Sequence, residues 1–136
     1  MGSITKQVHV DSAPDVVWDA VRDFGALHER LVRGFVVATE LDGRDRIVTF
    51  GNGMVQREPL VALDDDQRRL VYSATGSLLG ATHYNAAVQV AAGETGGSTI
   101  SWVIDFLPDE IAPALDQAME RGADAMRATL GPRSDS

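Results

Sequence analysis

The sequence has 136 residues, of which 44% are hydrophobic and 24% charged, and this is enough chain for one globular domain with a substantial core. A formal net charge of -8 predicts a surface that repels nucleic acid and anionic membranes, so we expect neither as a partner. The absence of cysteine excludes disulfides, thiolate nucleophiles and cysteine-based zinc sites. Since no membrane-spanning run or signal-peptide core is visible, we expect one cytoplasmic domain over 1–136, with flexible tails at 1–3 and 132–136.

The first third of the chain predicts a strand followed by two short helices. The run TKQVHV at 5–10 is typical of a strand, and DSAPDVVWDAVRDFG at 11–25 is typical of a helix with one apolar stripe. Ser12 is the expected cap of that helix, with Asp15 completing an acidic capping box. The segment ALHERLV at 26–32 predicts the second short helix.

Between residues 34 and 106 strand-like runs alternate with turn signals, which predicts an antiparallel meander of about six strands. The turn signals are Asp42-Gly43, Asn52-Gly53, the acidic residues 64–66, and the glycine-bearing segments 76–80 and 93–97. The segment 108–132 then repeats apolar residues every three or four positions, which predicts a helix of about 22 residues. Strands followed by one long helix indicate an α+β domain in which the helix packs on one face of the sheet.

Two stretches carry a resemblance to a known family. APDVVWDAVRDFG at 13–25 and VQREPLVALDDDQRRLVY at 55–72, followed by the long helix, resemble the START-like (SRPBCC, Bet v 1-like) superfamily in its polyketide cyclase/dehydrase branch. The resemblance covers about residues 5–130. It implies a helix-grip fold, in which a curved antiparallel sheet of about seven strands wraps around the C-terminal helix and encloses an apolar cavity. Its members include cyclases, lipid carriers and hormone receptors, so the fold leaves the activity open.

The orientation of Glu58 depends on the register of its hairpin. Asn52-Gly53 favours a two-residue turn that pairs Gly51 with Met54 and sets Ile47 opposite Glu58. One face of the hairpin then carries Thr49, Gln56, Ile47, Glu58, Leu60 and Ala62, and the other carries Phe50, Val55, Val48, Arg57, Val61 and Leu63. Hydrophobicity alone turns the second face inward. The resemblance implies the opposite, because the family's glutamate at the position of Glu58 points into the cavity, as does the aromatic residue at the position of Tyr72.

Several side chains are candidates for a site in such a cavity. Glu58 could act as a general acid or base, or be a structural glutamate bonded to Gln56 or to a tyrosine. The groups expected to polarise a substrate oxygen are Tyr72, Tyr84 and His28. The expected ligand-binding residues are Gln56, Leu60, Ala86, Trp102, Ile104, Met119, Gly122, Met126 and Arg30. For the aromatic and methionine residues the alternative is ordinary core packing, and for His28, Glu29, Arg30 and Arg33 it is a solvated helix face.

No metal or cofactor is expected. The histidines stand at positions 9, 28 and 83 without metal-ligand spacing, and His9 and His83 should face outward. No P-loop, dinucleotide-binding glycine pattern or serine-hydrolase elbow occurs in the sequence.

The predicted function is binding of a small apolar or aromatic, polyketide-like metabolite, with cofactor-independent cyclisation, dehydration or a related proton transfer. The alternative is a non-catalytic carrier or sensor of a hydrophobic small molecule or lipid. The expected partner is therefore the small ligand, and the protein is expected to be a monomer or a homodimer. Val55, Val61 and Leu63 would be exposed if Glu58 faces inward, and could then cover a dimer contact.

Overall fold

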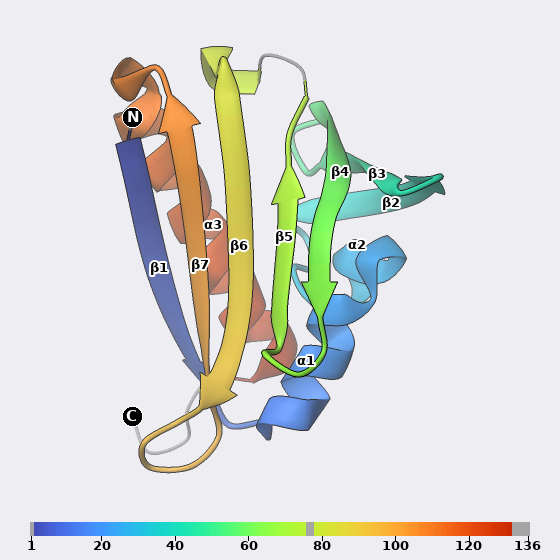
Figure 1. Cartoon of the computed structure of the whole chain (residues 1–136), viewed down its shortest axis with the longest axis vertical. Helices are drawn as coiled ribbons and strands as arrows, with labels where there is room; N and C mark the ends of the chain where they lie inside the picture. The colour runs from blue at the N-terminus through green and yellow to red at the C-terminus, as the bar shows by residue number, and fades with distance from the viewer. Residues whose placement is uncertain (1, 76–77, 132–136) are drawn as a thin grey trace.

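A computed structural model describes residues 2–75 and 78–131 of the chain. Within these residues seven strands form one antiparallel sheet in the order β1-β7-β6-β5-β4-β3-β2 (Figure 1). The strands are β1 Gly2–Val10, β2 Val36–Asp42, β3 Asp45–Phe50, β4 Val55–Asp64, β5 Arg69–Ser73, β6 His83–Ala92 and β7 Ser98–Leu107. β1 includes Gly2 and Ser3, which the sequence assigned to a tail, because both pair with β7. Residues 76 and 77 of one expected turn, Met1 and the expected tail at 132–136 lie outside the described residues.

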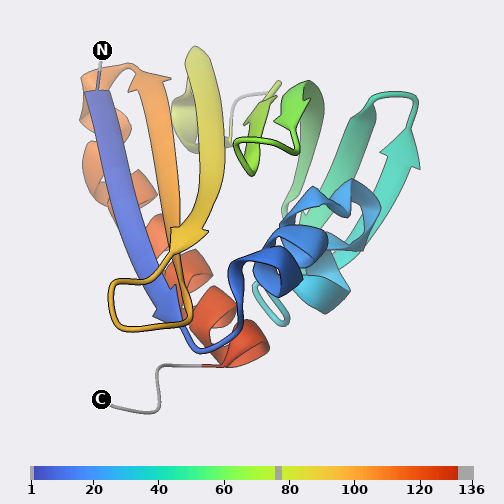
Figure 2. The same ribbon diagram turned by 60° about the horizontal axis from the view of Figure 1, so that its bottom comes forward.

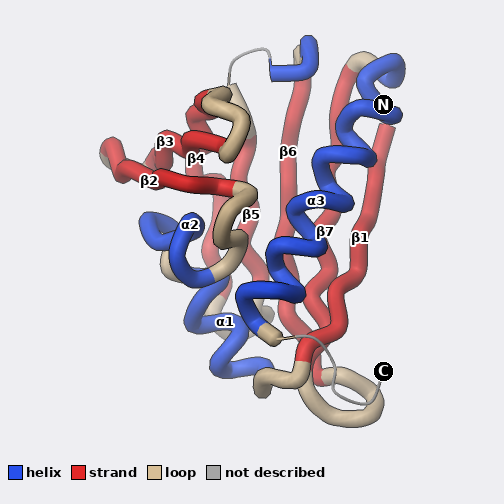
Figure 3. Tube along the Cα trace, turned by 180° about the vertical axis from the view of Figure 1, so that it is seen from behind, coloured by secondary structure: helices blue, strands red, loops and turns tan. Residues whose placement is uncertain are grey.

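The three α-helices of the described part of the chain all lie over the same face of the sheet (Figure 3). They are α1 Pro14–Arg22, α2 Leu27–Arg30 and α3 Ala112–Leu130, with short 3₁₀ turns at Phe24–Ala26 and Asp109–Ile111 leading into α2 and α3. Figure 2 shows that the sheet is curved and that the helices lie on its concave side. The predicted helix-grip fold is therefore confirmed, including the two short helices that follow the first strand.

α3 packs on the sheet through the stripe that its sequence predicts. Leu115, Met119 and Met126 are buried, and Ile111 is buried in the turn that precedes the helix. Gly122 allows a close approach, since a Cβ atom there would lie 2.9 Å from Cζ3 of Trp102. Burial of this stripe removes apolar surface from water, which is the main stabilising contribution available to a domain of this size.

The start of α1 differs from the prediction. The N-cap residue is Ala13, and no side chain caps it. The Ser12 hydroxyl instead donates a hydrogen bond of 3.2 Å to the carbonyl of Leu130 at the end of α3, and the Ser12 carbonyl accepts one of 2.7 Å from Ser98 Oγ. Ser12 thus satisfies a carbonyl that the end of α3 would otherwise leave without an intrahelical partner.

The β3–β4 register also differs from the prediction, by one residue. The amide of Phe50 donates to the carbonyl of Met54 and the amide of Gly53 to the carbonyl of Phe50, so the loop has three residues rather than two. Asn52 Oδ1 accepts a hydrogen bond from the Met54 amide, and Gly53 adopts a φ of 89°, which glycine tolerates. Arg46, and not Ile47, therefore lies opposite Glu58.

A bulge in β4 changes which side chains of that strand face the helices. Leu60 pairs with Tyr72, but Ala62 pairs with Val71, so one extra residue is inserted between them. Leu63 then lies opposite Leu70 and packs against the core, which corrects the expectation that it is exposed. Val55 and Val61 do lie on the outer face, where they are 56% and 52% exposed.

Candidate ligand-binding cavity

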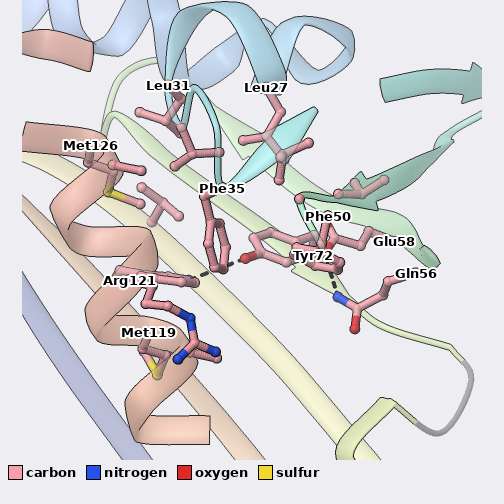
Figure 4. A pocket seen from close by; sticks show the side chains of 18 of the residues that line it. Leu27, Leu31, Phe35, Phe50, Gln56, Glu58, Tyr72, Met119, Arg121 and Met126 are labelled. Atoms are coloured by element: carbon pink, nitrogen blue, oxygen red, sulfur yellow. Dashed lines mark hydrogen bonds between the residues drawn. The ribbon is translucent and has the colours of Figure 1, made fainter. Parts of the chain in front are cut away.

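A cavity of about 440 Å³ lies between α3, the concave face of the sheet and the α2 region (Figure 4). Most of its wall is aliphatic and aromatic. Representative aliphatic residues are Leu31 after α2, Val36 at the start of β2, Val48 on β3, Leu70 on β5, Val88 on β6 and Met126 on α3. Pockets of roughly 300–1,000 Å³ with apolar walls and a few polar groups are typical of small-molecule binding sites.

The most deeply buried charged side chains of the cavity wall form an ion pair. Arg46 Nε donates to Glu58 Oε1 at 2.7 Å, and Gln56 Nε2 donates to Glu58 Oε2 at 2.6 Å. All three residues line the cavity, yet Arg46 and Glu58 are each only 3% exposed and Gln56 is 6% exposed. Each carboxylate oxygen of Glu58 therefore accepts one hydrogen bond, and the bond from Arg46 is also an ion pair.

Two aromatic rings hold the guanidinium of Arg46. Its Cζ atom lies 4.1 Å from the ring centroid of Phe24 and 4.8 Å from that of Tyr72, and Nη1 also donates to the Phe24 carbonyl at 3.4 Å. Cation–π contacts of this kind strengthen when they are removed from water. Arg46 thus links β3 to the turn after α1 as well as to Glu58. The prediction missed Arg46 because the one-residue register error placed its side chain on the other face of the hairpin.

The two tyrosines lie beside this ion pair. Tyr72 OH accepts a hydrogen bond of 3.2 Å from Trp102 Nε1. Burial, reinforced by the nearby charge of Glu58, raises the pKa of Tyr72, and burial, with Tyr72 and Glu58 as neighbours, raises the pKa of Tyr84 well above its ordinary value. Both hydroxyls therefore carry their protons at neutral pH, so either can donate a hydrogen bond.

Seven of the residues proposed from the sequence line the cavity. They are Glu58, Tyr72, Tyr84, Gln56, Trp102, Met119 and Met126. Three others belong to the hydrophobic core or pack against it and do not line the cavity, namely Ala86, Ile104 and Leu60. Gly122 does not line the cavity either. It allows the Trp102 ring to lie against α3, so it shapes the wall without forming it.

His28 and Arg30 do not reach the cavity. His28 Nδ1 lies 3.0 Å from Thr39 Oγ1 on β2, and Nε2 lies 3.4 Å from Glu29 Oε1. Arg30 forms ion pairs with Asp19 at 2.6 Å and with Asp23 at 3.0 Å, which hold it on the outer surface of α1 and α2. His9 and His83 are exposed, as expected. Among residues 2–75 and 78–131, no group of three or more potential ligands could hold a metal ion, and no helix is long and apolar enough to cross a membrane.

The mouth of the cavity is marked by lining residues that are exposed to solvent. Asn52 and Met54 come from the β3–β4 loop, Leu79 from the turn before β6, and Arg121 from α3. Phe35 and Phe50 stand behind this rim with an edge-to-face contact of 5.4 Å between ring centroids. The prediction missed all of these residues, since a polar residue on a helix and aromatic residues beside a turn carry no separate signal of a cavity in the sequence.

Comparisons with known proteins agree with this architecture. The family model described as polyketide cyclase / dehydrase and lipid transport matches residues 1–131. The protein XoxI from Bacillus cereus has a similar structure, with a TM-score of 0.85, 22% identity and 96% of each chain covered. The ginseng major latex-like protein 151 from Panax ginseng gives a TM-score of 0.76 at 17% identity, covering 96% of this chain and 98% of that one. Norcoclaurine synthase from Thalictrum flavum gives 0.68 at 20% identity, covering 93% of this chain and 84% of that one. No curated protein matches the sequence.

Proposed function

Because the chain belongs to the polyketide cyclase/dehydrase and lipid transport family, we propose that it binds a small apolar or aromatic molecule in the cavity between α3 and the sheet. The observation that carries this proposal is the cavity itself, whose volume of about 440 Å³ lies within the range typical of small-molecule sites. A well-packed interior contains few voids larger than a water molecule, so an apolar space of this size is not explained by folding alone.

The aromatic side chains of the wall support a planar ligand. Trp102 and Tyr72 meet on the inner side, and Phe35 and Phe50 meet near the mouth. Ring faces and edges of this kind pack well against aromatic ligands. The norcoclaurine synthase described above has been crystallised in complex with dopamine and hydroxybenzaldehyde, two small aromatic molecules.

Cofactor-independent cyclisation or dehydration is the second candidate function, supported by the position of Glu58 in the cavity wall next to Tyr72 and Tyr84. In such a reaction Glu58 would move a proton while a tyrosine hydroxyl donates to a developing oxyanion. Against it stands the ion pair of Glu58 with Arg46, because protonation of Glu58 would leave the buried Arg46 guanidinium without its counter-charge. The structure thus favours binding over proton transfer.

A cavity-filling variant tests the binding function. N-phenyl-1-naphthylamine is a neutral aromatic probe that becomes fluorescent in apolar surroundings, and we expect the wild-type protein to bind it. Ala118 lines the cavity from α3, so Ala118→Phe should weaken binding on the order of tenfold, because the added ring competes for the same space. Ala128→Phe on the exposed side of the same helix is the matched control and should bind like wild type. Equal binding by Ala118→Phe would show that the probe binds elsewhere.

Turnover separates the two candidate functions. Wild type, Glu58→Gln and Tyr84→Phe are incubated with a small-molecule extract of the source organism, and free and protein-retained compounds are compared by LC–MS. A carrier retains the same compound unchanged in all three proteins. An enzyme consumes a compound that Glu58→Gln retains, and the naphthylamine titration shows whether each variant keeps its cavity.

A further inference from the structure

The charged side chains of the cavity wall, within the described residues, are Arg46, Glu58 and Arg121. The first two neutralise each other at 2.7 Å in the buried network. Arg121 has neither an ion-pair nor a hydrogen-bond partner among the residues that the structure describes, and it is exposed at the mouth. Figure 4 shows its side chain extending from α3 toward the pocket.

Arg121 differs from the other cations in its position. The protein has 20 acidic residues against 12 basic ones, and many of its cations contact a carboxylate. In the described residues Arg33, Arg44, Arg69 and Arg121 have no ion pair, and of these four only Arg121 lines the cavity. The paired cations are Lys6, Arg22, Arg30, Arg57, Arg68 and Arg127. On α3 itself, Asp124 stands three residues after Arg121, within reach of an i,i+3 pair, but it pairs with Arg127 at 2.8 Å. Arg121 therefore keeps its donors available at the edge of an apolar cavity.

We propose that the ligand is an organic acid, whose apolar or aromatic body fills the cavity and whose carboxylate lies at the mouth beside Arg121. This inference rests on the proposed binding function and adds the chemical class of the ligand. The guanidinium presents a fork of donors that matches a carboxylate. At the mouth the anion keeps part of its hydration, whereas at the inner end it would lie in low dielectric next to Glu58, where no unpaired cation remains.

The overall charge makes the role of Arg121 testable. A net charge of -8 disfavours any anion, so a preference for an acid requires a local cation. The test compares N-phenyl-1-naphthylamine with 1-anilinonaphthalene-8-sulfonate, which has the same aromatic body and one added anionic group. Arg121→Gln should weaken binding of the sulfonate relative to the neutral probe by roughly three- to tenfold, and Arg121→Lys should keep most of the preference. High salt should reduce the difference between wild type and Arg121→Gln.

Arg44→Gln is the matched control, because it removes the same charge from an exposed arginine that does not line the cavity. Arg44 lies in the β2–β3 turn, at the opposite end of β3 from the β3–β4 loop (Figure 1). An unchanged ratio of the two dissociation constants in Arg121→Gln would overturn the inference, as would an equal change in Arg44→Gln, which would reflect net charge alone. If wild type binds neither probe, the proposed function itself fails. If the neutral probe binds and responds to Ala118→Phe while Arg121→Gln changes nothing, the function stands and only the ligand class is wrong.

Discussion

The inner and outer faces of the β3–β4 hairpin each carry arginine–carboxylate pairs at similar distances but in different surroundings. On the inner face Arg46 meets Glu58 at 2.7 Å, with side chains 4% and 5% exposed. On the outer face Arg57 meets Asp45 at 2.8 Å and Asp42 at 2.9 Å, with the arginine side chain 40% exposed. The outer pairs replace contacts that water would otherwise supply, whereas the inner pair has lost its water and depends on its own partners.

This difference separates polar side chains that are used to hold the fold together from polar side chains that are available to a ligand. A buried ion pair is stable only if its remaining hydrogen-bonding groups are satisfied. Gln56 and the Phe24 carbonyl supply hydrogen bonds, and the Tyr72 ring adds a cation–π contact. Such a network fixes the inner end of the cavity. The unpaired cation at the mouth, Arg121, is free to interact with what enters.

The largest effect is expected from breaking the inner pair. Arg46→Met leaves the buried Glu58 carboxylate without its cation, which should lower the free energy of unfolding by about 3–5 kcal/mol. Urea denaturation followed by circular dichroism measures this loss. The double variant Arg46→Met/Glu58→Met is the control, and it should regain most of the stability because no unpaired charge remains. A loss as small as that of a surface pair would mean that water reaches the inner pair.

High pH provides a second test of the inner face, which holds both tyrosines of the chain. Burial raises the pKa of Tyr72 and of Tyr84, so the folded protein keeps both protons where an unfolded tyrosine, with a pKa of about 10, releases its own. This contribution is complete below about pH 10 and is lost as the pH rises further, at about 1.4 kcal/mol per pH unit for each tyrosine. Urea midpoints between pH 9 and 11 measure the slope, and tyrosinate absorbance should appear only on unfolding.

Tyr84→Phe is the matched variant for the alkaline experiment. The pKa of Lys6 is also raised, first by its hydrogen bond to Asp116, so Lys6 changes stability in the same direction. Removing one tyrosine leaves that lysine contribution intact. It should reduce the slope of the unfolding free energy against pH by the contribution of one tyrosine. A slope that does not change in Tyr84→Phe would contradict the assignment to the buried phenols.

The comparison of the two hairpin faces also explains what the sequence could predict. Element order and apolar spacing were sufficient for the sheet, the short helices and α3, because each depends on local patterns. Local sequence did not determine which side chains of β3 point inward. Asn52-Gly53 is compatible with a two- or three-residue loop, and the hydrogen bond from the Met54 amide to Asn52 Oδ1 accompanies the three-residue loop. A one-residue difference was enough to hide Arg46 as the partner of Glu58.

The site was predictable only where a residue's face was known. Tyr72, Tyr84 and Trp102 lie on strands whose alternation is clear, and all three line the cavity. Glu58 was assigned to the inner face only through the family resemblance, since hydrophobicity pointed the other way. The position of Arg121 at the cavity could not be predicted from the sequence. Whether an exposed helical residue borders a cavity depends on the distance between α3 and the β3–β4 loop, and tertiary packing sets that distance.

The smallest loss of stability is expected from breaking the ion pairs on the outer face. Arg57→Gln removes a cation that contacts both Asp42 and Asp45, yet the side chains it leaves behind are hydrated. The urea midpoint should change little at low salt and not measurably at high salt, because exposed pairs are screened by ions. The same denaturation series that measures Arg46→Met measures this variant. A loss comparable with that of Arg46→Met would show that burial is not what distinguishes the two faces, and that the hairpin depends on its charges wherever they lie.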